Sequence, residues 1–407
     1  MDSVLMENKV LKLDKSNWKL TKVGELAKDI SKRVDNRSES GYDRFVGLNH
    51  FVSGDIKIKN WGPTESLTSS TKAFEAGDIL FARRNAYLRR ASLVDFDGCC
   101  SGDAFVLREN HEKVVPGFLA FFMNSNALWD YANSNAAGTM SKRVKWRDLA
   151  EYEILLPPKD QQAQLAKLLW AMDEVIEKEN NAIIKLERSL DTLIEKEIHG
   201  IELSGKAIQK VLEEYGKSNK LVNIDSIGQL LKGKGIPKAA VVSNGIPCIR
   251  YGELYTKHHR IVRKFNSFIT EETKLTSFLL KKNDIIFAGS GETITEIGKS
   301  AAFTDEIEAY AGGDTLIFRP KDMDGYYLGY LMNCQFVRQQ LNKYGTGATV
   351  MHIYNSDLSK VKIPVKTRQD QEKIGQKLEM VSNNVELLKS KNDNSKALQK
   401  SLINQVF

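Results

Sequence analysis

The stretch 158–199 decides the fold, and it reads PKDQQAQLAKLLWAMDEVIEKENNAIIKLERSLDTLIEKEIH, with no Gly and no Pro after its first residue. Apolar side chains recur in it at alternating steps of four and three residues, which is the heptad seam of a coiled coil. The apolar seam positions are Leu165, Leu169, Met172, Ile176, Ile183, Leu186, Leu190 and Leu193, and the steps also fall on Glu179 and Glu197. At about 1.5 Å per residue the helix spans roughly 63 Å. We therefore expect a rod that packs one narrow stripe against a partner helix.

The segment 366–407, at the other end of the chain, is the expected partner. Its seam residues keep the same alternation and are Ile374, Leu378, Val381, Val385 and Leu388. The apolar seam is missing over 390–395, and Leu398, Leu402 and Val406 resume it imperfectly. Either helix alone could simply pack on a globular domain. Two helices of equal length favour pairing with each other.

The rest of the chain repeats itself. Motifs around Asp78, Asp103 and Gly138 recur around Asp284, Asp314 and Gly347, with offsets of 206, 211 and 209 residues. Each copy is expected to hold buried strands (77–82 and 104–107; 283–288 and 312–319) and one apolar helix (116–131; 326–341). The predicted fold is mixed α/β, with domains at 1–157 and 221–365, long helices at 158–199 and 366–407, and a linker at 200–220. The chain order requires the paired helices to be antiparallel, with the two domains at opposite ends and an approximate two-fold axis between them.

Charge and cysteine content set limits on the class of protein. The 407-residue chain has a net charge of +7, and its four cysteines, Cys99, Cys100, Cys248 and Cys334, show no CxxC pair and no metal-ligand spacing. No run of about 18 apolar residues occurs. We expect a cytoplasmic protein with reduced thiols and no metal.

Motifs of common enzyme classes are missing from the sequence. Gly298-Lys299-Ser300 resembles the end of a phosphate-binding loop, but Thr293 stands where that motif needs glycine. No methyltransferase motif, nucleophile elbow or HExxH sequence occurs. These observations favour a protein without catalysis of its own.

Basic loops in both copies indicate a DNA-facing surface, because Arg and Lys on loops contact phosphates and Arg also reads guanine edges. A solvated charged surface is the simpler interpretation of any one cluster. The candidate DNA-binding residues are Arg83, Arg84, Tyr87, Arg89, Arg90, Lys142, Arg143 and Lys145 in the first copy, and Lys232, Lys234, Lys238, Lys257, His258, Arg260 and Arg263 in the second.

The ordered set of motifs resembles the specificity subunit of type I restriction-modification systems. The resemblance covers essentially the whole chain and rests on the duplication, on ILLPPKDQQ at 154–162 leading into the long helix, and on the strand motifs GDIL at 77–80 and NDII at 283–286. The second copy departs from the pattern, with Pro364-Val365 where a double proline is usual.

The resemblance implies a non-catalytic subunit in which each domain reads one half of an interrupted double-stranded DNA sequence. The helices would fix the spacing, and two methyltransferase subunits carrying S-adenosylmethionine would dock, with restriction subunits joining them. It also implies a prokaryotic cytoplasm. Two other classes stay open on the residues alone: a coiled-coil scaffold that binds no nucleic acid, and an RNA-modifying enzyme with unrecognised motifs. A basic face shared by both domains would favour DNA binding.

Overall fold

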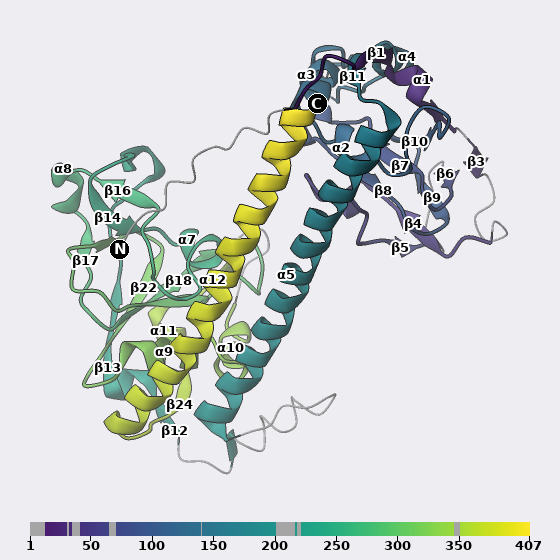
Figure 1. Cartoon of the computed structure of the whole chain (residues 1–407). Helices are drawn as coiled ribbons and strands as arrows, with labels where there is room; N and C mark the ends of the chain where they lie inside the picture. Colours follow the sequence, from purple (N-terminus) through teal and green to yellow (C-terminus); the bar gives the residue numbers. More distant parts are fainter. Residues whose placement is uncertain are drawn as a thin grey trace. The chain divides into compact units, whose positions relative to one another are not determined.

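Two long helices, α5 (Lys159–His199) and α12 (Arg368–Val406), run through both halves of the chain (Figure 1). The computed structural model describes residues 13–30, 32–34, 41–64, 71–139, 141–200, 216–217, 221–345 and 351–407. It separates into unit 1, Met1–Asn181 with Lys389–Phe407, and unit 2, Ala182–Leu388. The predicted linker 200–220 lies almost wholly outside the described residues.

Unit 1 contains one antiparallel sheet, one mixed sheet and the short antiparallel pair of β1 with β11. Its strand orders are β2-β10-β7-β8 and β3-β6-β9-β4-β5, and β4 is parallel to β9. The elements are β1 (Lys19–Lys22), α1 (Val23–Leu26), β2 (Ala27–Asp29), β3 (Arg33–Val34), β4 (Arg44–Val46), η1 (Leu48–His50), β5 (Gly62–Pro63), β6 (Thr71–Phe74), β7 (Ile79–Ala82), η2 (Ala86–Leu88), β8 (Ala91–Leu93), β9 (Gly98–Ser101), β10 (Ala104–Glu109), α2 (Leu119–Phe122), α3 (Asn126–Ser134), α4 (Trp146–Ala150) and β11 (Glu153–Leu156).

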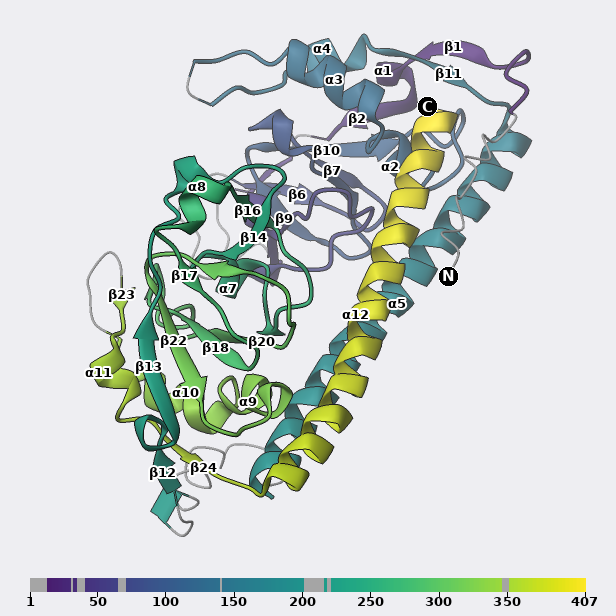
Figure 2. The ribbon, with the colours of Figure 1, turned by 90° about the vertical axis from the view of Figure 1, so that its left-hand side faces the viewer.

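Unit 2 has a similar plan, with strand orders β13-β22-β18-β20-β15 and β16-β14-β21-β17, with β14 parallel to β21 and β15 parallel to β20. Figure 2 shows β13, β22, β18 and β20 side by side in that order. Its short pairs are β12 with β24 and β19 with β23. The elements are β12 (Leu221–Asn223), η4 (Ile224–Ile227), β13 (Gly228–Lys232), η5 (Lys238–Ala240), β14 (Ile246–Ile249), α7 (Glu253–Thr256), β15 (Arg260–Ile261), β16 (Ser267–Ile269), α8 (Glu271–Lys274), β17 (Phe278–Leu279), β18 (Asp284–Ala288), β19 (Ser290–Gly291), β20 (Ser300–Phe303), β21 (Tyr310–Ala311), β22 (Thr315–Pro320), α9 (Gly325–Leu331), α10 (Gln335–Asn342), β23 (Met351–His352), α11 (Asn355–Leu358) and β24 (Lys362–Pro364).

The repeated aspartate at the start of the central strand fastens each larger sheet. Asp78 receives two hydrogen bonds from the Arg108 guanidinium, at 2.8 and 2.9 Å, and one from the Glu75 N–H. Asp284 is bonded in the same way by Arg319, at 2.8 and 2.7 Å. Both carboxylates are buried, so a bidentate charged partner is what makes their burial tolerable. The recurring sequence motif is thus a structural pair that joins neighbouring strands.

The helix predicted over 116–131 is wrong in detail, because it forms two helices. α2 ends at Phe122, and Ser125 then caps α3 by accepting a hydrogen bond from the Leu128 N–H. The same break separates α9 from α10 in unit 2. α1 ends at Leu26, and β2 begins at the next residue and pairs with β10.

Within unit 1, the first part of α5 lies antiparallel to the last part of α12. Asn392 donates to the Ile176 carbonyl at 3.1 Å, and Gln399 donates to the Leu169 carbonyl at 3.5 Å. Both polar side chains are buried on the four-three alternation of α12, so the seam continues where its apolar residues stop. The expectation that Leu398 belongs to the seam is wrong, since it is exposed.

Within unit 2, the other ends of the helices pack on the core formed by α9 and β22. Ile374 and Leu378 of α12 are buried there with Leu190 of α5. Beyond Leu190 the buried stripe of α5 passes through Ile194 and Ile198. The predicted seam position Leu193 is half-buried, and Glu197 is ion-paired with Lys377 at 2.7 Å. In the described residues, no helix has the length and apolarity needed to cross a membrane.

Candidate nucleic-acid interface

Three loops meet beyond the end of β7 in unit 1. The Arg83 N–H donates to the Asp103 carbonyl at 3.0 Å, and the Val144 N–H donates to the Arg83 carbonyl at 2.9 Å. Arg84 and Arg143 face each other in an isolated antiparallel bridge. Backbone hydrogen bonds therefore bring together residues that are separated by about 60 positions in sequence, whatever their side chains.

A single carboxylate organises the arginines of these loops. Arg143 Nε donates to Asp103 at 2.9 Å, and Arg84 and Arg83 lie within ion-pair distance at 3.4 and 3.9 Å. Burial acts to raise the pKa of Asp103, but the hydrogen bond and charge of Arg143, with the two other arginines, hold it below its ordinary value. The Arg84 and Arg143 side chains are 42 % and 43 % exposed. Three cations around one anion leave an exposed positive surface with fixed guanidinium positions.

The remaining candidates of unit 1 divide into exposed and anchored residues. Tyr87 is 69 % exposed on η2, and Lys142 and Lys145 are exposed beside the arginine cluster. Arg89 instead donates to Asn126 and Asp130 of α3, and Arg90 donates to the Leu48 carbonyl. These two arginines hold loops in place and present less of their donor capacity to a ligand.

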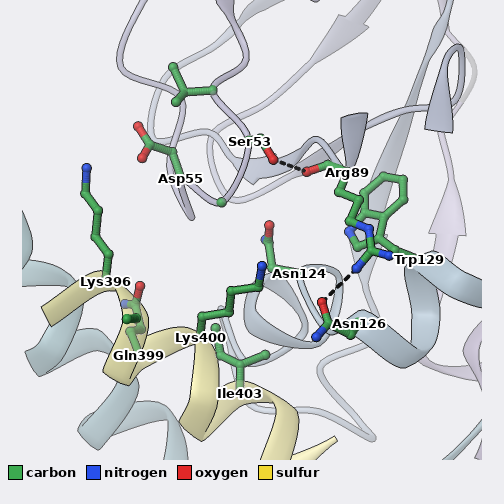
Figure 3. Close-up of a pocket in the computed structure, with 13 residues that line it drawn as sticks. Ser53, Asp55, Arg89, Asn124, Asn126, Trp129, Lys396, Gln399, Lys400 and Ile403 are labelled. Carbon is green, nitrogen blue, oxygen red and sulfur yellow. Dashed lines mark hydrogen bonds between the residues drawn. The ribbon is translucent and has the colours of Figure 1, made fainter. Parts of the chain in front are cut away.

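Figure 3 shows a pocket of about 260 Å³ beside Arg89. Its walls are the loop containing Ser53 and Asp55, the N-terminus of α3, and the side chains of Lys396 and Lys400 on α12. The Ser53 hydroxyl donates to the Arg89 carbonyl at 3.4 Å. The pocket therefore lies against the anchored arginine, on the helix side of unit 1.

Unit 2 builds the same loop frame from different side chains. The Gly289 N–H donates to the Asp314 carbonyl at 2.8 Å, and the Ile353 N–H donates to the Gly289 carbonyl at 3.0 Å. Ser290 and His352 occupy the places of Arg84 and Arg143, and Ser290 Oγ lies 3.0 Å from His352 Nδ1. A hydroxyl–imidazole pair thus replaces the arginine pair of the first copy.

The predicted residues of unit 2 also divide by exposure. Four lysines, Lys232, Lys234, Lys238 and Lys257, are exposed. His258 is buried, and desolvation lowers its pKa. Arg260 is ion-paired with Asp191 of α5, and Arg263 with Glu379 of α12 at 2.8 Å. The two arginines therefore attach the sheets to the helices within unit 2.

Sequence reasoning missed Asp103, Ser141, Ser290 and His352 as members of this frame. Ser141 accepts a hydrogen bond from Arg84 Nε at 2.7 Å. The signal that could have found the last two is the repeat itself, because an offset of 209 carries Arg143 to His352.

The model of the type I restriction modification DNA specificity domain matches residues 15–188 and 217–395, which is most of the chain. The chain belongs to this specificity subunit family. It is 22 % identical over 410 residues to the type I restriction enzyme MjaVIII specificity subunit of Methanocaldococcus jannaschii, covering 95 % of this chain and 91 % of the relative. It is 26 % identical over 201 residues to the EcoDI specificity subunit of Escherichia coli, covering 47 % of this chain and 44 % of the relative.

Solved specificity subunits share the fold. The S subunit of a type I system from M. genitalium matches with a TM-score of 0.58 at 16 % identity, covering 98 % of each chain. A chain from a structure concerning assembly of the type I R-M system matches with a TM-score of 0.55 at 20 % identity, covering 96 % of this chain and 97 % of that one. The predicted family and fold class are confirmed.

Proposed function

We propose that this chain is the non-catalytic DNA-reading subunit of a type I restriction-modification complex, and that each of its two domains reads one half of a bipartite site. The observation that carries the proposal is the shared loop frame. Arg84 and Arg143 occupy it in unit 1, and Ser290 and His352 occupy it in unit 2. One frame with two different sets of donors and acceptors suits a subunit that reads two different half-sites.

The chemistry of each set fits base edges in the major groove. A guanidinium can donate two hydrogen bonds to guanine, whereas a serine hydroxyl or an imidazole can act as donor or acceptor. Asp103 fixes the guanidinium planes of unit 1 before binding, which lowers the entropy lost on contact. The exposed lysines of both units would contact phosphates and contribute a salt-dependent affinity without sequence preference.

The long helices would set the spacing between half-sites and bind two methyltransferase subunits, with restriction subunits joining through them. Exposed apolar side chains support a docking role: Leu168 and Val175 on α5 in unit 1, and Met380 and Leu387 on α12 in unit 2. S-adenosylmethionine would be held by the methyltransferase subunits. Such a complex would act in the cytoplasm of a prokaryote.

Co-expression with candidate methyltransferase subunits, followed by mapping of methylated adenines or cytosines across a genome, tests this function. We expect methylation at one interrupted sequence. Replacing residues 18–157 with the matching segment of another family member should change one half of that sequence and keep the other. Methyltransferase that co-purifies with the chain but methylates no defined site would support the scaffold alternative instead.

A further inference from the structure

A buried cluster in unit 2 brings together three different metal-ligating side chains. Glu195 and His199 stand one turn apart on α5, and Cys334 immediately precedes α10. His199 Nε2 lies 3.3 Å from Cys334 Sγ and 3.7 Å from Glu195 Oε2, and all three ligand atoms lie within 4.8 Å of one another. The residues are only 4 %, 8 % and 3 % exposed.

Part of this cluster has a structural task that both copies share. Glu195 Oε1 accepts a hydrogen bond from the Gln335 N–H at 2.6 Å, at the start of α10. In unit 1 the Asn126 N–H donates to Asn404 Oδ1 at 2.7 Å, at the start of α3. The two contacts are related by the 209-residue offset, so one amide oxygen is sufficient to satisfy the start of this helix.

Unit 2 adds chemistry that helix capping does not need. Cys334 of unit 2 stands at the position that corresponds to Ser125 of unit 1, and Glu195 stands at the position that corresponds to Asn404. The second carboxylate oxygen, Glu195 Oε2, is buried and accepts no hydrogen bond from the described residues, although it faces the imidazole of His199. A buried carboxylate oxygen without a donor is costly unless a charge or a donor meets it.

We propose that Glu195, His199 and Cys334 form a binding site for a zinc-class divalent cation. Thiolate, imidazole and carboxylate are the ligands that Zn²⁺ prefers, and its bond lengths of about 2.0 to 2.3 Å place neighbouring ligand atoms about 3.3 to 3.7 Å apart in a tetrahedron. The two separations from His199 Nε2, 3.3 and 3.7 Å, fall in this range, and the third pair, Glu195 and Cys334, lies within 4.8 Å. A thiolate and a carboxylate would together neutralise the ion, so the filled site carries no net buried charge.

The site would connect α5 to the start of α10 inside unit 2. Burial acts against the charged form of each group: it raises the pKa of Glu195 and of Cys334 and lowers that of His199 to about 4. Metal binding would release the proton of the Cys334 thiol. The ring of His199 also packs edge-on against Phe336, at 5.3 Å between centroids, which holds the imidazole in place.

The full-length chain, stripped with chelator and then dialysed against Zn²⁺, tests the site by elemental analysis. We expect about one retained zinc per chain, lost in Cys334→Ser, His199→Gln and Glu195→Gln. Glu195→Gln keeps an oxygen for the Gln335 N–H, so it separates ligation from capping. Cys248→Ser and His258→Gln are matched controls, because both residues are buried in unit 2 outside the cluster, and they should retain the metal.

Co²⁺ gives a second measurement on the unaltered chain, which does not depend on the variants folding. Ligation by Cys334 should produce thiolate-to-cobalt charge-transfer absorption in the near ultraviolet, and Zn²⁺ should abolish it. No absorption from the unaltered chain, or equal zinc content in Cys334→Ser and Cys248→Ser, would overturn the proposal. No DNA or methyltransferase is needed for either assay, so failure of the proposed function leaves this result independent.

Discussion

The loop after β7 in unit 1 and the loop after β18 in unit 2 have the same backbone contacts but different chemistry. In unit 1 the Arg83 N–H donates to the Asp103 carbonyl, and the Arg83 carbonyl accepts a hydrogen bond from the Val144 N–H. In unit 2 the Gly289 N–H and carbonyl make the same two hydrogen bonds, with Asp314 and Ile353. The side chains at the facing positions differ, with Arg84 and Arg143 in one copy and Ser290 and His352 in the other. Main-chain hydrogen bonds therefore hold the frame in both units, and its side chains are left available for recognition.

The largest expected effect comes from breaking the buried pairs that both copies share. Asp78→Ala and Asp284→Ala each remove a carboxylate that binds an arginine twice, so each should lower the free energy of unfolding of its unit by about 3 kcal/mol. All five tryptophans, Trp18, Trp61, Trp129, Trp146 and Trp170, belong to unit 1. Tryptophan fluorescence during urea denaturation therefore follows unit 1, and far-ultraviolet circular dichroism follows both units.

Asp95→Ala is the control for this pair of variants, because Asp95 is exposed. It should change the unfolding free energy by less than about 0.5 kcal/mol. A fluorescence midpoint that moves equally in Asp78→Ala and Asp284→Ala would contradict the assignment of one pair to each unit.

Exchanging the facing side chains tests whether the frame separates stability from recognition. The double variant Arg84→Ser with Arg143→His gives unit 1 the side chains of unit 2, and we expect a loss of about 1–3 kcal/mol of binding free energy for DNA that carries the first half-site. Recognition of the other half-site should persist. Binding to DNA duplexes with each half-site altered in turn measures this, at a stated salt concentration.

The reciprocal variant, Ser290→Arg with His352→Arg, should impair only the second half-site. A matched control, Lys145→Ala, should weaken binding to all sequences alike and lower the salt dependence by about one ion. If the exchanged side chains alter neither half-site, the frame does not read bases.

A smaller effect is expected at the polar part of the helix seam. Asn392→Ala removes the buried hydrogen bond to the Ile176 carbonyl and should cost about 1 kcal/mol in unit 1. Asn394→Ala, an exposed neighbour, is the control. Fluorescence-detected unfolding measures both, and a loss in Asn392→Ala no larger than the change in Asn394→Ala would contradict a contribution from this hydrogen bond.

The smallest effect concerns the pH dependence of stability in unit 2. Burial lowers the pKa of His258 in the folded chain, so the unfolded chain takes up a proton first as pH falls below about 6.5, and the stability of unit 2 decreases there. His258→Gln should remove this part of the pH dependence. Circular dichroism melts between pH 7 and pH 5 test it, and a slope unchanged by the variant would contradict it.

The sequence was informative where a pattern is local and periodic. The heptad spacing predicted α5 to within one residue of its observed start and α12 to within two. The pattern did not predict which residues are buried along the last part of α12, because only apolar residues were counted. Asn392 and Gln399 are polar, but they are buried and keep the four-three alternation. The break between α2 and α3 was missed because the apolar residues on both sides were read as one helix, although Asn124, Ser125 and Asn126 interrupt them and Ser125 is a favourable N-cap residue.

The candidate interface was harder to predict because its organisation is not local. Clusters of cations in sequence do not reveal that Asp103 gathers three arginines, or that Arg260 and Arg263 are ion-paired with the long helices. Burial of His258 depends on the packing of unit 2 and leaves no mark in the pattern of charges around it.

The backbone origin of the loop frame has an evolutionary consequence. Most substitutions are limited by the stability that a fold can lose. At positions 84, 143, 290 and 352 the neighbouring main chain is fastened by N–H and carbonyl groups, which are present in every residue except for the N–H of proline. Substitutions at these positions should therefore pass the stability threshold more often than core substitutions do. Selection could then explore new DNA targets, one copy at a time, while the fold is retained.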